Sequence, residues 1–229
     1  MNRIAAAVLL LLANHAGAQP GAPTIPPDDT EAAHAAMEAG NFAEAYYLWR
    51  GLADAGDADA QYNLGWMYHN GYGLAIDDRQ AQRWWDSAAG RGSTDALYAL
   101  GNLHRFGGRG VPPDAMRAVD YFVAAAEKGD DESALLLRTL MARNDASVSA
   151  RRADLLMLHG DALGAAIVVR KDNTGFRKAA AVEAEVLAVF AQGKRLVELS
   201  RRSSGWVQAG DPEDGRIGWV RGTLVEAAK

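Results

Sequence analysis

The fold of this chain is decided by Ala60-Gln61-Tyr62-Asn63-Leu64-Gly65-Trp66-Met67-Tyr68, which recurs 36 positions later as Ala96-Leu97-Tyr98-Ala99-Leu100-Gly101-Asn102-Leu103-His104. Each copy is followed by a glycine-rich stretch, then by an alanine with an aromatic residue three positions later, and then by an Ala-Ala pair and a closing glycine. The Ala-Ala pairs lie 37 positions apart, so the second copy has one more residue in its loop. Self-similarity at this period is typical of stacked helical repeats. We therefore expect an α-solenoid of helical hairpins.

The repeat extends to both sides of this pair. Towards the N-terminus, the segment from Phe42 to Ala55 repeats the second-helix pattern, with the alanines again 36 and 37 positions apart. Towards the C-terminus, Ala153 and Leu156 echo it without the glycine loop, as expected of a terminal capping unit. Helical periodicity runs from Glu31 to about Leu163, so we expect the solenoid to cover residues 30–163.

Small and large residues alternate in a way that predicts how the hairpins pack. A glycine inside a helix costs about 1 kcal/mol relative to alanine, so its recurrence at Gly65 and Gly101 indicates a packing need. We expect Leu64, Tyr68 and Trp84 to fill the space between successive hairpins. The remaining glycines should form the tight turns, with positive φ at Gly71, Gly73, Gly107, Gly108 and Gly110. Asp77 and Asp114 are expected to cap the second helix of each hairpin.

At these positions the sequence resembles the Sel1-like repeat family, which is related to tetratricopeptide repeats. The pattern Ala-x-x-x-Leu-Gly-x-x-Tyr, Gly-x-Gly, Ala-x-x-Trp, Ala-Ala-x-x-Gly is matched almost fully in the first copy, whereas the second departs from it at His104 and inside the loop. The resemblance extends over about Thr30 to Gly160. It implies a protein-binding scaffold without intrinsic catalytic chemistry.

From Ala165 onwards the periodicity changes from helical to strand-like. Short β-branched and apolar runs alternate with turn signals, and the expected strands are Ile167–Val169, Val186–Phe190, Arg195–Leu199, Trp206–Ala209 and Ile217–Val220. Five short strands in residues 165–229 predict a small closed β-barrel that folds as a separate module. The two tryptophan signatures, Gly205-Trp206-Val207 and Gly215-Arg216-Ile217-Gly218-Trp219-Val220, resemble those of bacterial SH3-like domains. Ala179-Ala180 replaces the Gly-Pro usual in the first loop of that family.

The N-terminus is typical of an exported protein. Met1 to Ala18 combines a basic start at Arg3, a short apolar run and small residues before Gln19, so we predict a signal peptide cleaved after Ala18 and a periplasmic location. The apolar run is too short to span a bilayer comfortably, and no cysteine follows it, so no stable membrane anchor is expected. An uncleaved anchor or a disordered start is the alternative reading. Residues 19–29 predict an extended linker because they contain Pro20, Pro23, Pro26 and Pro27.

Charge and composition narrow the classes of partner. Residues 19–164 hold 12 Lys/Arg and 21 Asp/Glu, a net charge of −9, whereas residues 165–229 hold 11 and 8, a net charge of +3. This balance argues against a nucleic acid partner, because phosphate neutralisation needs clustered cations. A partner with a basic face would be steered towards the acidic solenoid, and the basic tail could compete for the same surface. Cysteine is absent, which excludes disulfides and thiolate sites.

No constellation in the sequence predicts catalysis, a cofactor or a metal site. His69 and His104 do not occupy aligned positions and have too few ligand neighbours for a metal. Asp54, Asp57 and Asp59, and likewise Asp130-Asp131-Glu132 at the matching position between repeats, are better explained as caps of the next helix than as calcium ligands. The Asp77-Asp78 pair could carry acid–base chemistry, but cap electrostatics explains it more simply. We therefore expect a protein that is not an enzyme.

The surface expected to bind a partner is the face of the first helices next to their core face. In one hairpin this face presents Tyr62, Trp66 and His69, and in the next it presents Tyr98, Asn102 and Arg105. These residue types are common at interface hot spots, although Trp66 could instead pack against the neighbouring hairpin. The sequence thus favours an exported scaffold or regulatory adaptor of the cell envelope that holds a protein or peptide on a concave helical face. Peptidoglycan binding through the SH3-like module is the alternative.

Overall fold

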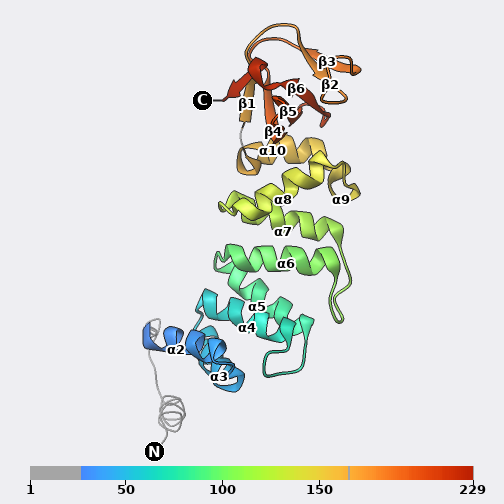
Figure 1. The fold of residues 1–229 in the computed structure, drawn as a ribbon. Helices are drawn as coiled ribbons and strands as arrows, with labels where there is room; N and C mark the ends of the chain where they lie inside the picture. Colours follow the sequence, from blue (N-terminus) through green and yellow to red (C-terminus); the bar gives the residue numbers. More distant parts are fainter. Residues whose placement is uncertain (1–26, 165, 229) are drawn as a thin grey trace, which may run out of the picture.

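The computed structural model describes residues 27–164 and 166–228, so the predicted signal peptide and linker residues 19–26 lie outside the described residues. The helices stack in one column, with a β-sheet at the end remote from α2 (Figure 1). In chain order they are α2 (Pro27–Glu38), α3 (Phe42–Asp54), α4 (Ala58–Asn70), α5 (Asp78–Gly90), α6 (Thr94–Phe106), α7 (Ala115–Glu127), α8 (Asp131–Ala142), α9 (Ala146–Ser149) and α10 (Arg152–Leu163). This confirms the predicted α-solenoid.

The two copies of the repeat are the hairpins α4–α5 and α6–α7, whose helices are packed against each other. Aspartates begin the helices as predicted. The Asp77 carboxylate accepts hydrogen bonds from the backbone N–H groups of Arg79 and Gln80, and Asp114 does the same at the start of α7. Of the acidic groups between repeats, Asp57 caps α4 by accepting from the N–H of Ala60, and Asp130 caps α8 by accepting from the N–H of Ser133. The N-terminal helix starts earlier than predicted, at Pro27, so the last three residues of the expected linker are helical.

Four of the five predicted turn glycines have the left-handed backbone that a side chain disfavours: φ is +76° at Gly71, +73° at Gly73, +76° at Gly107 and +73° at Gly110. The prediction is wrong for Gly108. This residue is required for a different reason, since a Cβ atom here would lie 2.6 Å from Oδ2 of Asp78.

Trp84, which the repeat pattern predicts to fill the space between successive hairpins, packs against the buried cluster that Leu64 forms with α2 and α3. The aromatic side chain buried within each hairpin is the next residue. Trp85 and its counterpart Phe122 are 2% and 1% exposed, whereas Trp84 and Tyr121 are only half-buried. The aromatic residue of the sequence pattern therefore lies at the edge of the helix–helix contact. The next residue, 100° further round the helix, points into it.

The tail forms a seven-stranded antiparallel sheet, which confirms that a strand domain follows the helices. Its strands are β1 (Ala166–Val169), β2 (Thr174–Arg177), β3 (Val186–Phe190), β4 (Arg195–Arg201), β5 (Trp206–Gly210), β6 (Ile217–Arg221) and β7 (Val225–Ala227). The order is β3-β2-β6-β5-β4-β1-β7, so the end strands β3 and β7 do not pair and the predicted closed barrel is wrong. The β2–β3 ribbon pairs with β6 at Arg177 and Trp219, and its Phe176 and Phe190 lie in one buried cluster with Ile167 and Val207 of the other strands.

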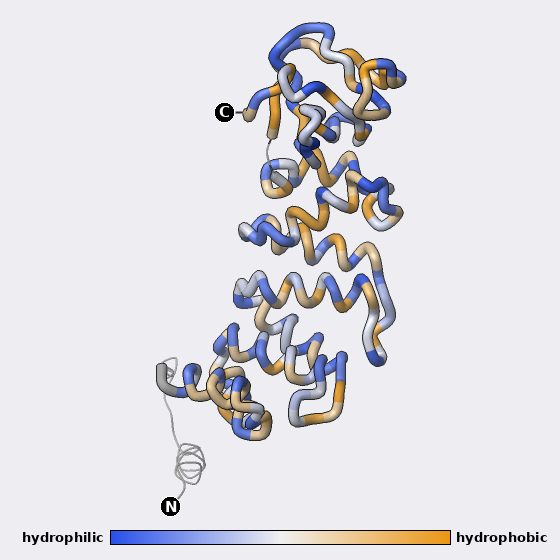
Figure 2. Tube along the Cα trace, viewed as in Figure 1, coloured by the Kyte–Doolittle hydropathy of each residue, from blue (hydrophilic) through white to orange (hydrophobic). Residues whose placement is uncertain are grey.

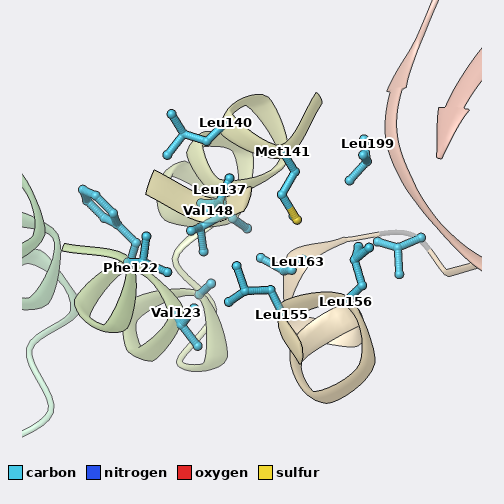
Figure 3. Packing of buried hydrophobic residues seen from close by; sticks show 14 of the residues in the cluster. Phe122, Val123, Leu137, Leu140, Met141, Val148, Leu155, Leu156, Leu163 and Leu199 are labelled. Carbon is cyan, nitrogen blue, oxygen red and sulfur yellow. The ribbon is translucent and has the colours of Figure 1, made fainter. Parts of the chain in front are cut away.

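The sheet is packed onto the last helices of the solenoid. Val197 and Leu199 of β4 belong to the same buried cluster as Met141 of α8 and Leu156 of α10, and Figure 3 shows Leu199 beside these helices. The amide of Gln208 in β5 donates a 3.0 Å hydrogen bond to the carbonyl of Ala142, at the end of α8. The predicted competition of the basic tail for the α4 and α6 face is not seen in this arrangement, because the sheet lies on α8 and α10.

Apolar and polar residues alternate along the helices of the stack (Figure 2). This distribution is typical of helices that bury one face against neighbouring helices. Within the described residues, no helix has the length and apolar character needed to cross a membrane.

Candidate partner-binding pocket

A pocket of about 390 Å³ lies on the face of the first helices of the two repeats. We call it the α4–α6 pocket, because these helices supply most of its walls and α5 and α8 add one residue each. Its lining consists of Tyr62, Trp66, His69, Trp85, Asp95, Tyr98, Ala99, Asn102, Leu103, Phe106, Gly107 and Glu132. It is an aromatic hollow with two carboxylates.

The helical spacing explains why these side chains come together. On α4, Ala60, Leu64 and Met67 are fully buried in the stack. Tyr62 and Trp66 are four positions apart on the neighbouring stripe, so they lie one above the other. The equivalent stripe of α6 supplies Tyr98, Asn102 and Phe106, and the stacking of the hairpins places the two stripes side by side.

Five of the six residues that the sequence singled out line this one pocket: Tyr62, Trp66, His69, Tyr98 and Asn102. Arg105 does not. Its guanidinium carbon lies 4.9 Å from the ring centroid of Phe106, and the side chain is exposed outside the pocket. Trp66 is 40% exposed, so packing against the neighbouring hairpin does not bury it.

His69 is held in place by a buried carboxylate beneath the pocket. Its Nδ1 lies 2.5 Å from Oδ1 of Asp78, a residue that is 3% exposed. The other oxygen, Oδ2, accepts a 2.5 Å hydrogen bond from the backbone N–H of Arg109, in the loop of the second repeat. Asp78 therefore joins a pocket residue of one repeat to the loop of the next.

Two tyrosines of the pocket lie close to acidic groups. The hydroxyl of Tyr98 donates a 2.9 Å hydrogen bond to Oε1 of Glu132. Burial raises the pKa of the Tyr98 phenol. Burial also raises the pKa of Tyr62, and the negative charge of Asp95 adds to this effect. Both phenols are therefore uncharged hydrogen-bonding groups at neutral pH.

The chemistry of the lining suits binding. Aromatic faces offer apolar contact, while Asp95 and Glu132 supply negative charge, and no lysine or arginine lines the pocket. Among the described residues, no group of three or more His, Asp or Glu side chains is placed to hold a metal ion. His104 is buried at 3% exposure and stacks on Tyr121 with ring centroids 5.5 Å apart, as expected for a structural histidine.

Sequence reasoning missed several members of the site. Phe106 is 70% exposed and could have been found by extending the α6 stripe by one helical turn from Asn102. Glu132 comes from α8, and no local pattern points to it. Asp78 was interpreted only through helix-cap electrostatics, and its bond to His69 depends on how the loop Gly71–Asp77 folds back.

The repeat itself is identified by comparison with known families. The family model described as Sel1 repeat matches residues 58–93 and 94–130. Residues 58–130 thus match the Sel1 repeat model in two consecutive copies. They correspond to the hairpins α4–α5 and α6–α7, so the α4–α6 pocket is formed largely by Sel1 repeat residues. Proteins with Sel1 repeats are generally protein-interaction scaffolds.

Three solved structures are similar to part of the chain. A Sel1 repeat protein from Oxalobacter formigenes is 23% identical, with a TM-score of 0.48, over 51% of this chain and 48% of that one. A protective antigen of uropathogenic Escherichia coli strains with an SLR fold is 25% identical, with a TM-score of 0.48, over 58% and 29%. Helicobacter pylori cysteine rich protein B is 21% identical, with a TM-score of 0.38, over 49% and 97%. The chain thus spans about half or less of the first two proteins. No curated protein sequence matches it.

Proposed function

We propose that this Sel1 repeat protein is an exported, non-enzymatic scaffold or regulatory adaptor of the cell envelope, and that its partner is a protein or peptide held in the α4–α6 pocket. The observation that carries the proposal is the pocket itself, where two consecutive repeats bring together Trp66 and Phe106, which belong to none of the buried clusters of the described residues. Trp66 and Phe106 are 40% and 70% exposed at its wall.

Exposed aromatic residues in a pocket are costly in water unless a partner covers them. Aromatic residues dominate interface hot spots because they bury a large apolar area with few rotatable bonds. Asn102 and the two carboxylates add groups that would orient the bound segment by hydrogen bonds. The volume of about 390 Å³ suits one or two side chains of a partner rather than a whole domain.

The test is capture of binding partners from native envelope extract by the full chain and its variants. We expect the double variant Trp66→Ala, Phe106→Ala to lose partners that the unmodified chain captures, because each hot-spot aromatic contributes about 2 kcal/mol or more to binding. Both side chains are exposed enough that the melting temperature should change little. Met116→Ala in α7 is the matched control, since Met116 is 50% exposed and lies outside the pocket.

Peptidoglycan is the competing partner, through the strand domain. Co-sedimentation of the same proteins with purified sacculi separates the two candidates. If the double variant keeps its partners and the chain sediments with sacculi, the wall-binding function replaces the one proposed here.

A further inference from the structure

We infer that the α4–α6 pocket receives a basic side chain, arginine or lysine, of its partner, and that Asp78 prepares the pocket for it by fixing His69 as a hydrogen-bond acceptor. This inference rests on the proposed function, and it adds the chemistry that the partner must have. Three features carry it: the aromatic walls, the carboxylates without counter-ions, and the buried bond between His69 and Asp78.

The walls of the pocket suit a cation. Tyr62, Trp66 and Tyr98 present aromatic rings, whose faces attract ammonium and guanidinium groups, and the ring of Phe106 at the edge already has the Arg105 guanidinium 4.9 Å from its centroid. The chain uses such contacts elsewhere: the guanidinium carbons of Arg202 and Arg221 lie 4.3 and 4.4 Å from tryptophan ring centroids in the sheet.

The acidic groups of the pocket have no counter-ion. None of the ion pairs formed among the described residues involves Asp95 or Glu132. No lysine or arginine lines the pocket, and Arg105, which lies against Phe106, forms no ion pair with either carboxylate. A basic side chain would balance their negative charge, whereas an acidic one would be repelled.

The bond between His69 and Asp78 adds an acceptor. A carboxylate can only accept, so the Nδ1 atom of His69 must carry the hydrogen in this contact. In the neutral imidazole, Nε2 then has a free lone pair. The Asp78 carboxylate is fixed in this orientation, because it is buried and its second oxygen accepts from the N–H of Arg109. The hydrogen bond therefore keeps the hydrogen of the neutral ring on Nδ1.

Together these groups form a set of acceptors around an aromatic hollow. Nε2 of a neutral His69 and the carboxylates of Asp95 and Glu132 can accept hydrogen bonds, and the two carboxylates supply negative charge. A guanidinium or ammonium group is the protein side chain that supplies several donors and positive charge at once. Asp78 acts through His69 and is a positioning residue.

The variant that isolates this role is Asp78→Asn. Its amide oxygen would still accept from the N–H of Arg109, while its N–H would now donate to Nδ1 of His69. The imidazole hydrogen then moves to Nε2. Nε2 becomes a donor, which cannot bond to the N–H groups of a basic side chain and repels them. Asparagine would therefore keep both hydrogen bonds, to His69 and to the N–H of Arg109. If Asp78 only held the loop and His69 together, Asp78→Asn would leave binding unchanged. His69→Phe, which keeps a ring but has no acceptor, is a second variant.

The experiment selects peptides from a random 12-residue library on the full chain and keeps those whose binding is lost with Trp66→Ala, Phe106→Ala. Dissociation constants are then measured for each peptide and for versions with single arginines or lysines replaced by norleucine. We expect one such replacement to weaken binding about ten-fold or more, as for a hydrogen bond to a charged group. We expect Asp78→Asn and His69→Phe to weaken the binding of the parent peptide by a similar factor. The same two variants should bind the norleucine-substituted peptide about as well as the unmodified chain does.

The outcomes separate the two proposals. Peptides that depend on Trp66 and Phe106 but tolerate every norleucine replacement within two-fold overturn the basic side chain and leave the proposed function standing. Unchanged affinity in both Asp78→Asn and His69→Phe overturns the positioning role. A library that yields no peptide dependent on Trp66 and Phe106 overturns the proposed function together with this inference.

Discussion

Gly65 lies so close to Trp85 that a Cβ atom on it would stand 2.4 Å from the indole Nε1. The same indole N–H donates a 3.1 Å hydrogen bond to the carbonyl of Tyr62, so the ring is held against the first helix. The relationship repeats in the next hairpin, where a Cβ atom on Gly101 would stand 2.5 Å from Cε1 of Phe122. Both glycines are therefore required by packing, as their recurrence in the sequence predicts.

Gly65→Ala and Gly101→Ala should each destabilise the fold, although alanine is the better helix former by about 1 kcal/mol. Overpacking of this kind costs about 1–3 kcal/mol, because the buried aromatic ring has to move with its surroundings. Urea unfolding followed by circular dichroism measures the change. Gly51→Ala in α3 is the control, since beyond its own helix backbone no described atom would lie within 4 Å of a Cβ atom there and the change should stabilise. Equal effects at Gly51 and Gly65 would contradict the packing argument.

The helices and the sheet should unfold together. Leu156 of α10 is 2% exposed, and a Cβ atom on Gly210 of the sheet would lie 2.5 Å from its Cδ1. Leu156→Ala is therefore expected to cost about 2–5 kcal/mol. Calorimetry should show one transition, moved as a whole to lower temperature in the variant.

Two separate transitions in the unmodified chain would show that the sheet is an independent unit, as the sequence predicts. The stability of the sheet should depend on the helices, because Val197 and Leu199 are buried in a cluster shared with them and would be exposed to water without them. A fragment of residues 165–229 should accordingly be less stable than the sheet in the full chain, which amide exchange can measure.

Stability should fall as the pH drops below about 6.5, in part because of His104. Burial lowers the pKa of His104, and the nearby cation of Arg117 adds to the effect. Below the pKa of an unfolded histidine the unfolded chain takes up a proton that the folded chain refuses, so the free energy of unfolding decreases there and is unaffected at higher pH. Urea unfolding at pH 7.5 and pH 5.5 measures the difference.

His104→Phe should reduce that pH dependence. Neither ring nitrogen of His104 has a hydrogen-bond partner among the described residues, so phenylalanine should not lower stability at pH 7.5. His159→Gln is the control, because His159 contacts the Glu127 carboxylate near the surface. An unchanged pH dependence in His104→Phe would refute the role of His104.

Export should remove residues 1–18. The predicted cleavage after Ala18 is tested by intact-mass measurement of the chain expressed in a bacterial host and recovered from the periplasm. A recovered species that begins at Met1, or one confined to the cytoplasm, would refute the secretory prediction.

Local patterns in the sequence determined the repeat, the helix caps and most of the turn glycines. Each of these depends on hydrogen bonds or backbone angles within a few residues, as at Asp77 and Gly71, so composition and spacing are sufficient. The stripe of Tyr62, Trp66 and His69 followed from helical periodicity for the same reason.

Tertiary structure alone decided the features that depend on the exact rotation and stacking of helices. A rotation of one residue separates buried Trp85 from half-buried Trp84, and spacing alone cannot resolve it. Glu132 reaches the pocket from a third helix, and Asp78 meets His69 only because the intervening loop folds back. The open sheet and its seat on α8 and α10 likewise follow from long-range burial of Val197 and Leu199, which no local signal encodes.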